Sequence, residues 1–289
     1  MSEITMIGLG AIGSALAQTL LKAGRGVTVW NRSPKKMEPL VALGARGTTD
    51  LGEAIEASSR LMICITDYAA TSVLLNQPGV PSLLNDRTVI QFSTGTPKEA
   101  ADFETWVGAQ GATYLDGAIM VNPASIGGDD AQILVAGPEE TFEQCQGLLS
   151  CLGGDLRYLG ANVRAAATLD LALLSYIECA IFGVIHGVSM CESEGISLEQ
   201  FADLLPEGTW GRPKVQFILE NAFGIGPGGA TVDVIAAILK RLQDQARNAG
   251  INSEIPDLLS SLLQRAIMAG YGGEDTAAVI KVLRDTNRP

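Results

Sequence analysis

Short apolar runs alternate with helix-length segments along the first part of the chain. The apolar runs predict strands at residues 4–7, 26–30, 61–65, 88–92, 113–116 and 131–136. The segments between them predict helices at residues 14–21, 50–57, 69–75 and 97–110. Strands and helices that alternate in this order build a parallel sheet with helices on its faces. We therefore predict an α/β domain built on a doubly wound parallel sheet.

The strand pattern stops near Gly160, and long apolar-rich helical segments follow from Arg164 onward. The stretch from Leu169 to Met190 is apolar nearly all round, so we expect a helix enclosed on every side, either between domains or in a dimer core. Its charged residues would be costly in a bilayer, which argues against a membrane span. The pattern predicts a sheet domain at residues 1–160, an interdomain helix at residues 161–191 and an all-α C-terminal domain at residues 192–289.

A glycine-spaced turn, Gly8-Leu9-Gly10-Ala11-Ile12-Gly13, joins the first predicted strand to the first predicted helix. In a dinucleotide-binding unit one glycine permits the turn, one lets backbone N–H groups approach a pyrophosphate, and one lets helix and strand pack closely. The N-terminus of the helix adds partial positive charge. Because strand, turn and helix come in the required order, we expect all six residues to line a dinucleotide site.

The segment after the second predicted strand indicates which dinucleotide binds. An NAD-binding unit usually has an acid here for the ribose 2′-hydroxyl, but this chain continues with Asn31, Arg32, Ser33 and, three positions later, Lys36. A guanidinium, a hydroxyl and an ammonium suit the dianion of a 2′-phosphate, which favours NADPH over NADH. The alternative is a solvated loop, but three of the chain's 20 lysines and arginines fall within five positions here.

Composition excludes several classes of function. The 289-residue chain is 47% hydrophobic and 18% charged, and its net charge of -12 argues against nucleic acids and anionic membranes as partners. The five cysteines form no CxxC pair, and a single histidine cannot complete a Ser-His-Asp or zinc site, so we predict reduced thiols and no metal. The chain starts almost at once with a strand and has no evident signal peptide, which favours the cytoplasm.

Two acids on the predicted central helix are candidates for chemistry. Asp170 and Glu178 lie eight positions apart, about 80° round a helix and roughly 12 Å along it, so both could face one cleft. Neither has a Lys or Arg three or four positions away, and a carboxylate on an apolar helix must be paired, neutralised or used. The alternative is a structural acid that reaches solvent at the helix edge. No lysine occurs between Lys98 and Lys214.

Several loops fall where open α/β sheets bind ligands, at the carboxyl ends of predicted strands. Ser93 and Thr94 follow one strand and could contact the nicotinamide or the substrate, although Thr94 or Thr96 could instead cap the next helix. The glycine-containing loop at residues 116–127 could equally approach a ligand or simply connect two strands. We also assign to the cofactor site the residues after the third strand, Ile65, Thr66 and Asp67.

These blocks together resemble the imine reductases and reductive aminases, a branch of the β-hydroxyacid dehydrogenase superfamily. The resemblance runs over nearly the whole chain and rests on residues 7–13, 29–33, 93–97, 116–120, 169–175 and 270–275. It implies an N-terminal Rossmann domain, a long interdomain helix, and a helical C-terminal domain that is exchanged reciprocally in a homodimer. Asp170 falls where the family carries an Asp or Tyr, and where the hydroxyacid dehydrogenases carry a lysine.

The resemblance also implies the reaction. We expect hydride transfer from NADPH to the carbon of an imine or iminium ion, with Asp170 holding or protonating the nitrogen and Thr94 beside it. At Glu178 many relatives carry an aromatic residue, so this acid either tightens the binding of cationic amines or changes which face of the imine is reduced. A ketone or hydroxyacid oxidoreductase and a non-catalytic NADP(H)-binding protein are the alternatives. The expected substrate pocket consists of Ile119, Met120, Leu174 and, from the partner chain, Trp210.

Overall fold

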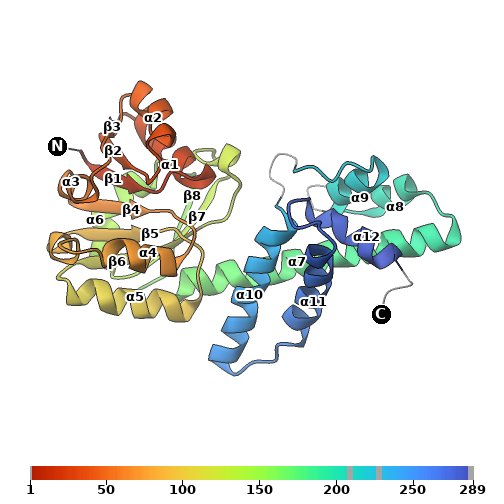
Figure 1. The fold of residues 1–289 in the computed structure, drawn as a ribbon. Coiled ribbons are helices and arrows are strands. Elements are labelled where there is room, and N and C mark those ends of the chain that lie inside the picture. The colour runs from red at the N-terminus through yellow and green to blue at the C-terminus, as the bar shows by residue number, and fades with distance from the viewer. Residues whose placement is uncertain (1, 207–210, 226–229, 286–289) are drawn as a thin grey trace. The chain divides into compact units, whose positions relative to one another are not determined.

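The computed structural model describes residues 2–206, 211–225 and 230–285. Contacts between residues divide the chain into two compact units, Met1–Asp170 and Leu171–Pro289. The first unit contains a single eight-stranded sheet, and the second is helical (Figure 1).

The sheet of the first unit has the strand order β3-β2-β1-β4-β5-β6-β7-β8. Its strands are β1 (Ile4–Ile7), β2 (Val27–Trp30), β3 (Arg46–Gly47), β4 (Arg60–Ile63), β5 (Thr88–Gln91), β6 (Thr113–Ile119), β7 (Gln132–Ala136) and β8 (Asp155–Tyr158). Its α-helices are α1 (Ala11–Lys22), α2 (Glu38–Ala42), α3 (Leu51–Glu56), α4 (Tyr68–Leu75), α5 (Pro97–Ala109) and α6 (Glu139–Leu149). The predicted α/β class, a doubly wound and mainly parallel sheet, is confirmed.

Apolar layers cover both faces of this sheet. Met6 of β1 packs in the layer formed with α1 and α6, whereas the next residue, Ile7, packs in the layer formed with α3, α4 and α5. Met62 and Ile63 of β4 divide in the same way. Strands that are buried on both faces need apolar side chains at successive positions, which explains why they appear in the sequence as continuous apolar runs.

One pair of strands departs from the parallel arrangement. β7 runs antiparallel to β6, with Asp116 opposite Ala136 and Ile119 opposite Ile133. A parallel return needs a long crossover, usually through a helix, but the connection at residues 120–131 contains only the 3-10 turn Pro123–Ser125. The chain therefore folds back beside β6.

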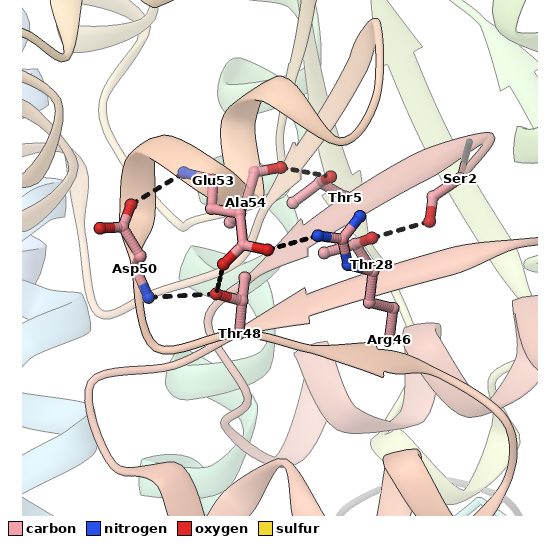
Figure 2. A network of polar contacts seen from close by, with 8 residues as sticks. All are labelled: Ser2, Thr5, Thr28, Arg46, Thr48, Asp50, Glu53 and Ala54. Carbon is pink, nitrogen blue, oxygen red and sulfur yellow. Dashed lines mark hydrogen bonds and ion pairs between the residues drawn. The ribbon is translucent and has the colours of Figure 1, made fainter.

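A polar network connects the β3 edge of the sheet to α3 (Figure 2). The Thr5 hydroxyl of β1 donates to the Ala54 carbonyl at 2.8 Å, and the Thr48 hydroxyl donates to the Glu53 carboxylate at 2.6 Å. Arg46 of β3 pairs with the same carboxylate, and the Thr48 and Arg46 contacts together lower the pKa of Glu53. The Arg46 and Thr48 contacts attach β3 to α3, and β3 pairs with β2, which leads into the predicted cofactor loop.

The second unit is a cluster of helices around its own apolar core. The long helix α7 (Arg164–Glu194) begins in the first unit and is followed by α8 (Leu198–Leu204), α9 (Gly211–Leu219), α10 (Val232–Ala249), α11 (Glu254–Met268) and α12 (Val279–Arg284). Helices α10 and α11 lie side by side. Thr231 caps the start of α10 by accepting a hydrogen bond from the Val234 N–H, and Gly250, with φ of +66°, ends it in the left-handed region.

The single chain leaves one face of α7 exposed, so its own described residues do not enclose the helix on every side, and enclosure in a dimer core stays a prediction. Leu169 is 47% exposed and Tyr176 is 67% exposed. The exposed positions recur every three or four residues and form one stripe: Leu169, Ala172, Leu173, Tyr176, Cys179, Ala180, Gly183, His186 and Met190. Among the described residues, α7 is also the one helix long and apolar enough to cross a membrane, a criterion that core helices of soluble proteins meet as well.

Candidate functional site

The glycine turn lies between β1 and α1, and its first and last glycines are required by the packing of the protein itself. Gly8 has φ of +95°, and a Cβ on it would lie 2.4 Å from the Cys64 carbonyl oxygen and 2.3 Å from the Ile65 side chain. A Cβ on Gly13 would lie 2.1 Å from the Gly8 carbonyl oxygen. All three distances are far below van der Waals contact, so only glycine fits at these two positions.

The middle glycine has a different environment. A Cβ on Gly10 would meet no protein atom within 4 Å, so no neighbouring protein atom excludes a side chain there. Gly10 is the N-cap residue of α1, and the first turn of that helix contains no acid. Open space in front of backbone N–H groups at a helix N-terminus is what a bound pyrophosphate requires.

A groove of about 650 Å³ runs from the glycine turn to the loop after β2. Asn31 connects the two, because its side-chain oxygen accepts from the Leu9 N–H at 3.0 Å while its amide donates to the Ser33 carbonyl at 3.1 Å. Arg32 and Lys36 are exposed and form no ion pair with any described residue. The groove is lined by Gly8, Leu9, Gly10, Ala11, Ile12, Gly13, Asn31, Arg32, Ser33, Lys36, Ile65 and Thr66, among others.

These residues fit a dinucleotide with a 2′-phosphate. The groove combines an open helix N-terminus with two cations that no carboxylate of the described chain neutralises. The third residue predicted beside Ile65 and Thr66 does something else in the structure: Asp67 caps α4 by accepting from the Ala70 N–H at 2.7 Å, and it does not line the groove. Its assignment to the cofactor stays a prediction.

A second, smaller cavity of about 80 Å³ shares Ile12 with the groove. Its lining includes Ser93, Thr94, Asp116, Ile119 and Asp170, so four residues predicted for chemistry or binding are brought together there. The hydroxyl of Ser93 is also structural, since it accepts from the Ile65 N–H at 3.0 Å and donates to Gln91 at 3.2 Å. The capping of α5 falls to Thr96, which forms a capping box with Glu99.

Asp116 is a functional candidate that the sequence reasoning did not single out. It is 1% exposed, and one carboxylate oxygen, Oδ1, accepts hydrogen bonds from the hydroxyls of Tyr68 and Tyr114. Burial raises the pKa of Asp116 to about 7, although both tyrosine contacts act in the opposite direction. Its position within an apolar strand was the available signal, because an acid there must be buried with partners.

The two acids predicted on the central helix lie in different units. Asp170 is half-buried and lines the small cavity of the first unit. Glu178 is 2% exposed within the second unit, where burial raises its pKa to about 7, the Lys214 charge lowers it and the Asp275 charge raises it. Lys214 is bound to Asp275, with its Nζ 2.6 Å and 2.8 Å from the two carboxylate oxygens. A cation from α9 thus acts on Glu178, although none is near it in sequence.

The other predicted residues are dispersed. Met120 packs beside the small apolar cluster of Ala118 and Leu134, and Leu174 is half-buried on α7. Trp210 lies outside the described residues. His186 is exposed on α7. Within the described part of the chain, no group of three or more His, Cys, Asp or Glu residues is placed to hold a metal ion.

Known protein families match both parts of the chain. The NAD-binding domain of 6-phosphogluconate dehydrogenase matches residues 3–160, and the C-terminal domain of NADPH-dependent reductive aminase-like proteins matches residues 162–285. The chain is 30% identical to an NADPH-dependent reductive aminase of Aspergillus oryzae, over 98% of this chain and 97% of that protein.

Two solved structures are similar over their whole length. One is a reductive aminase from Aspergillus terreus in complex with NADPH and ethyl-5-oxohexanoate, with 33% identity, a TM-score of 0.66, and coverage of 98% of this chain and 100% of that one. The other is a 3-hydroxyisobutyrate dehydrogenase from Salmonella typhimurium, at 20% identity and a TM-score of 0.84 over 98% and 100% of the two chains, which shows likeness of fold alone. The C-terminal family match and the two reductive aminases of Aspergillus confirm what the motifs indicated. The chain belongs to the family of NADPH-dependent imine reductases and reductive aminases.

Proposed function

We propose that this protein reduces imines or iminium ions to amines with NADPH. The observation that carries the proposal is the carboxyl group of Asp170 in a cavity that shares Ile12 with the dinucleotide groove. Bound NADPH supplies the hydride. The residues of the chain have to bind the cofactor, hold the C=N group beside it and deliver one proton to the nitrogen.

Charge explains why a carboxyl group suits this position. An iminium ion is cationic, so a carboxylate at Asp170 stabilises it, whereas the ammonium of a lysine would repel it. Thr94 lines the same cavity and offers a hydroxyl, and Ile119 contributes an apolar wall. Asp170 therefore has the role of holding or protonating the substrate nitrogen, with Thr94 as a hydrogen-bonding neighbour.

The test separates chemistry from cofactor binding. Asp170→Asn keeps the shape of the side chain but removes its charge, and should lower the rate of imine reduction by about 100-fold or more. The affinity for NADPH, measured by calorimetry, should stay nearly unchanged, because Asp170 does not line the groove. Equal losses in rate and affinity would contradict the assignment. A panel of cyclic imines and simple ketones, scored by NADPH consumption, tests whether C=N is the preferred bond.

We also propose that the protein is a homodimer in which α7 packs against the partner chain. The support is the exposed stripe of α7, where Leu169, Leu173 and Tyr176 present large apolar side chains to solvent in the single chain. Such a face is stabilised when a second copy covers it. Light scattering on the purified protein should give twice the chain mass. Leu173→Glu should shift the protein toward the monomer, and a wild-type protein that is monomeric at all concentrations would refute the proposal.

A further inference from the structure

The two carboxyl oxygens of Asp116 have different surroundings. Oδ1 accepts from the Tyr114 hydroxyl at 2.9 Å and from the Tyr68 hydroxyl, and the two hydroxyls lie 3.0 Å from each other. The other oxygen, Oδ2, is buried and has no hydrogen bond of normal geometry to any described residue. A buried oxygen without a partner is costly, so it needs either a donor or a proton of its own.

The groups around Asp116 favour a proton on its buried oxygen Oδ2. Burial raises the pKa of both phenols well above their ordinary value, so they remain donors and saturate Oδ1. The Glu99 charge also raises the pKa of Tyr68, whereas the N–H of Ala167 at the start of α7 lowers the pKa of Asp116 without offsetting the effect of burial. The remaining charged neighbour is Asp170, which lines the same cavity and disfavours a second negative charge on Asp116.

We propose that Asp116 and Asp170 form a carboxyl pair that holds one shared proton, and that this pair is the proton source for the substrate nitrogen. Two carboxyl groups in one small cavity cannot easily both ionise, so one of them stays protonated near neutral pH. The proton belongs on Oδ2 of Asp116, because Oδ1 already accepts two hydrogen bonds. This inference rests on the proposed function and adds a second catalytic carboxyl group to it.

Reduction of a neutral imine forms a C–H bond with the hydride that the cofactor supplies, and the π electrons of the C=N bond move to nitrogen. The nitrogen then takes a proton from the pair, so that one O–H bond breaks and one N–H bond forms. The pair is left with two negative charges and regains one proton from water. A permanently charged N-alkyl iminium ion accepts the hydride alone and needs no proton.

This difference between the substrates provides the kinetic experiment. Asp116→Asn removes the titrating group but keeps its shape. It should lower kcat for a neutral cyclic imine by about 100-fold, while kcat for an N-methyl iminium salt changes less than about threefold. Equal losses on both substrates would overturn the proton-source role. Failure of the proposed function is distinguishable, because the wild-type protein would then reduce neither substrate.

A second measurement needs no cofactor. Infrared spectroscopy detects the C=O stretch of a protonated carboxylic acid, and it is applied to the free protein carrying Glu178→Gln, because burial also raises the pKa of Glu178 to about 7. In this background a band should persist at neutral pH and disappear above it. Asp116→Asn should remove this band, and Asp170→Asn should shift its loss to lower pH. The exposed acid Asp102, paired with Lys98, provides the control, since Asp102→Asn should change neither the band nor the kinetics. A band that survives unchanged in Asp116→Asn would refute the shared proton.

The tyrosines give a test that keeps both acids. The Tyr114 hydroxyl lowers the pKa of Asp116, so Tyr114→Phe should raise that pKa and move the infrared titration to higher pH. The falling limb of the pH–rate profile for the neutral imine should move in the same direction. If Tyr114 were purely structural, Tyr114→Phe would lower the melting temperature without moving either titration, and that result would contradict the proposed proton on Asp116.

Discussion

Replacing Lys214 by methionine tests whether the buried ion pair of the second unit is essential to its stability. The Lys214 side chain is 7% exposed and that of Asp275 is 0% exposed, and their atoms approach to 2.6 Å and 2.8 Å. Methionine preserves most of the volume but removes the cation. Among the described residues, Asp275 would then keep one hydrogen-bond donor to its buried carboxylate, the Ala277 N–H at 2.8 Å.

Removal of one partner from a buried pair costs about 3–5 kcal/mol, because the other charge is left uncompensated. Denaturation with urea at neutral pH should show this loss, and the melting temperature should fall by roughly 10 °C. The matched control is Lys240→Met, which breaks the exposed pair with Asp244 and should cost less than about 1 kcal/mol. The double variant Lys214→Met with Asp275→Asn should recover most of the loss. Equal effects of the two single lysine substitutions would refute the reasoning.

Three further results are expected. Arg32→Ala should weaken NADPH binding by about 10- to 100-fold and change NADH binding little. The control Lys35→Ala, on the same loop but outside the groove, should have little effect on the binding of either cofactor. Equal losses of NADPH and NADH affinity in Arg32→Ala would contradict the 2′-phosphate assignment. Gly10→Ala should weaken cofactor binding with little loss of stability, whereas Gly13→Ala should lower the free energy of unfolding; calorimetry and urea denaturation distinguish them. Burial raises the pKa of Glu178 from 4.5 to about 7, so between these pH values the folded chain holds a proton that the unfolded chain has released, and the free energy of unfolding falls as pH rises. Urea denaturation at both ends of this pH interval measures the fall, and Glu178→Gln should reduce it. An equal fall in the wild-type protein and in Glu178→Gln would show that Glu178 titrates normally.

Local sequence signals predicted β1, β2, β4, β5, β6 and β7 because most of their residues are buried. β1 and β5 begin where apolar runs begin, and α5 begins at Pro97 as expected. The missed strands have weaker signals: β3 has two exposed residues, and β8 is partly exposed at the sheet edge. The antiparallel direction of β7 is set by a connection too poor in helix to cross the sheet, which strand periodicity does not report.

The candidate site also has a part that the sequence predicts and a part that it does not. The dinucleotide groove is built from segments that are contiguous in sequence, so Gly8–Gly13 and Asn31–Lys36 could be recognised from spacing alone. The carboxyl cavity is assembled from separate elements, and the partners of Asp116 come from α4 and β6. Residues that meet only through the tertiary structure leave little trace in a single sequence.

Glu178 and Asp170 show why helix geometry alone does not assign function. Both lie on α7 and both lack a cation within the helix, yet Glu178 shares a buried region with Lys214, whose ammonium group is hydrogen-bonded to Asp275. The ammonium therefore lowers the pKa of Glu178 too little to offset burial, which raises that pKa to about 7. Asp170 instead lines a cavity that shares Ile12 with the dinucleotide groove, and the carboxyl group of Asp116 lines the same cavity. We infer that the charge needed to hold an iminium ion is provided by Asp170, and that Glu178 tunes the stability of the helical unit with pH.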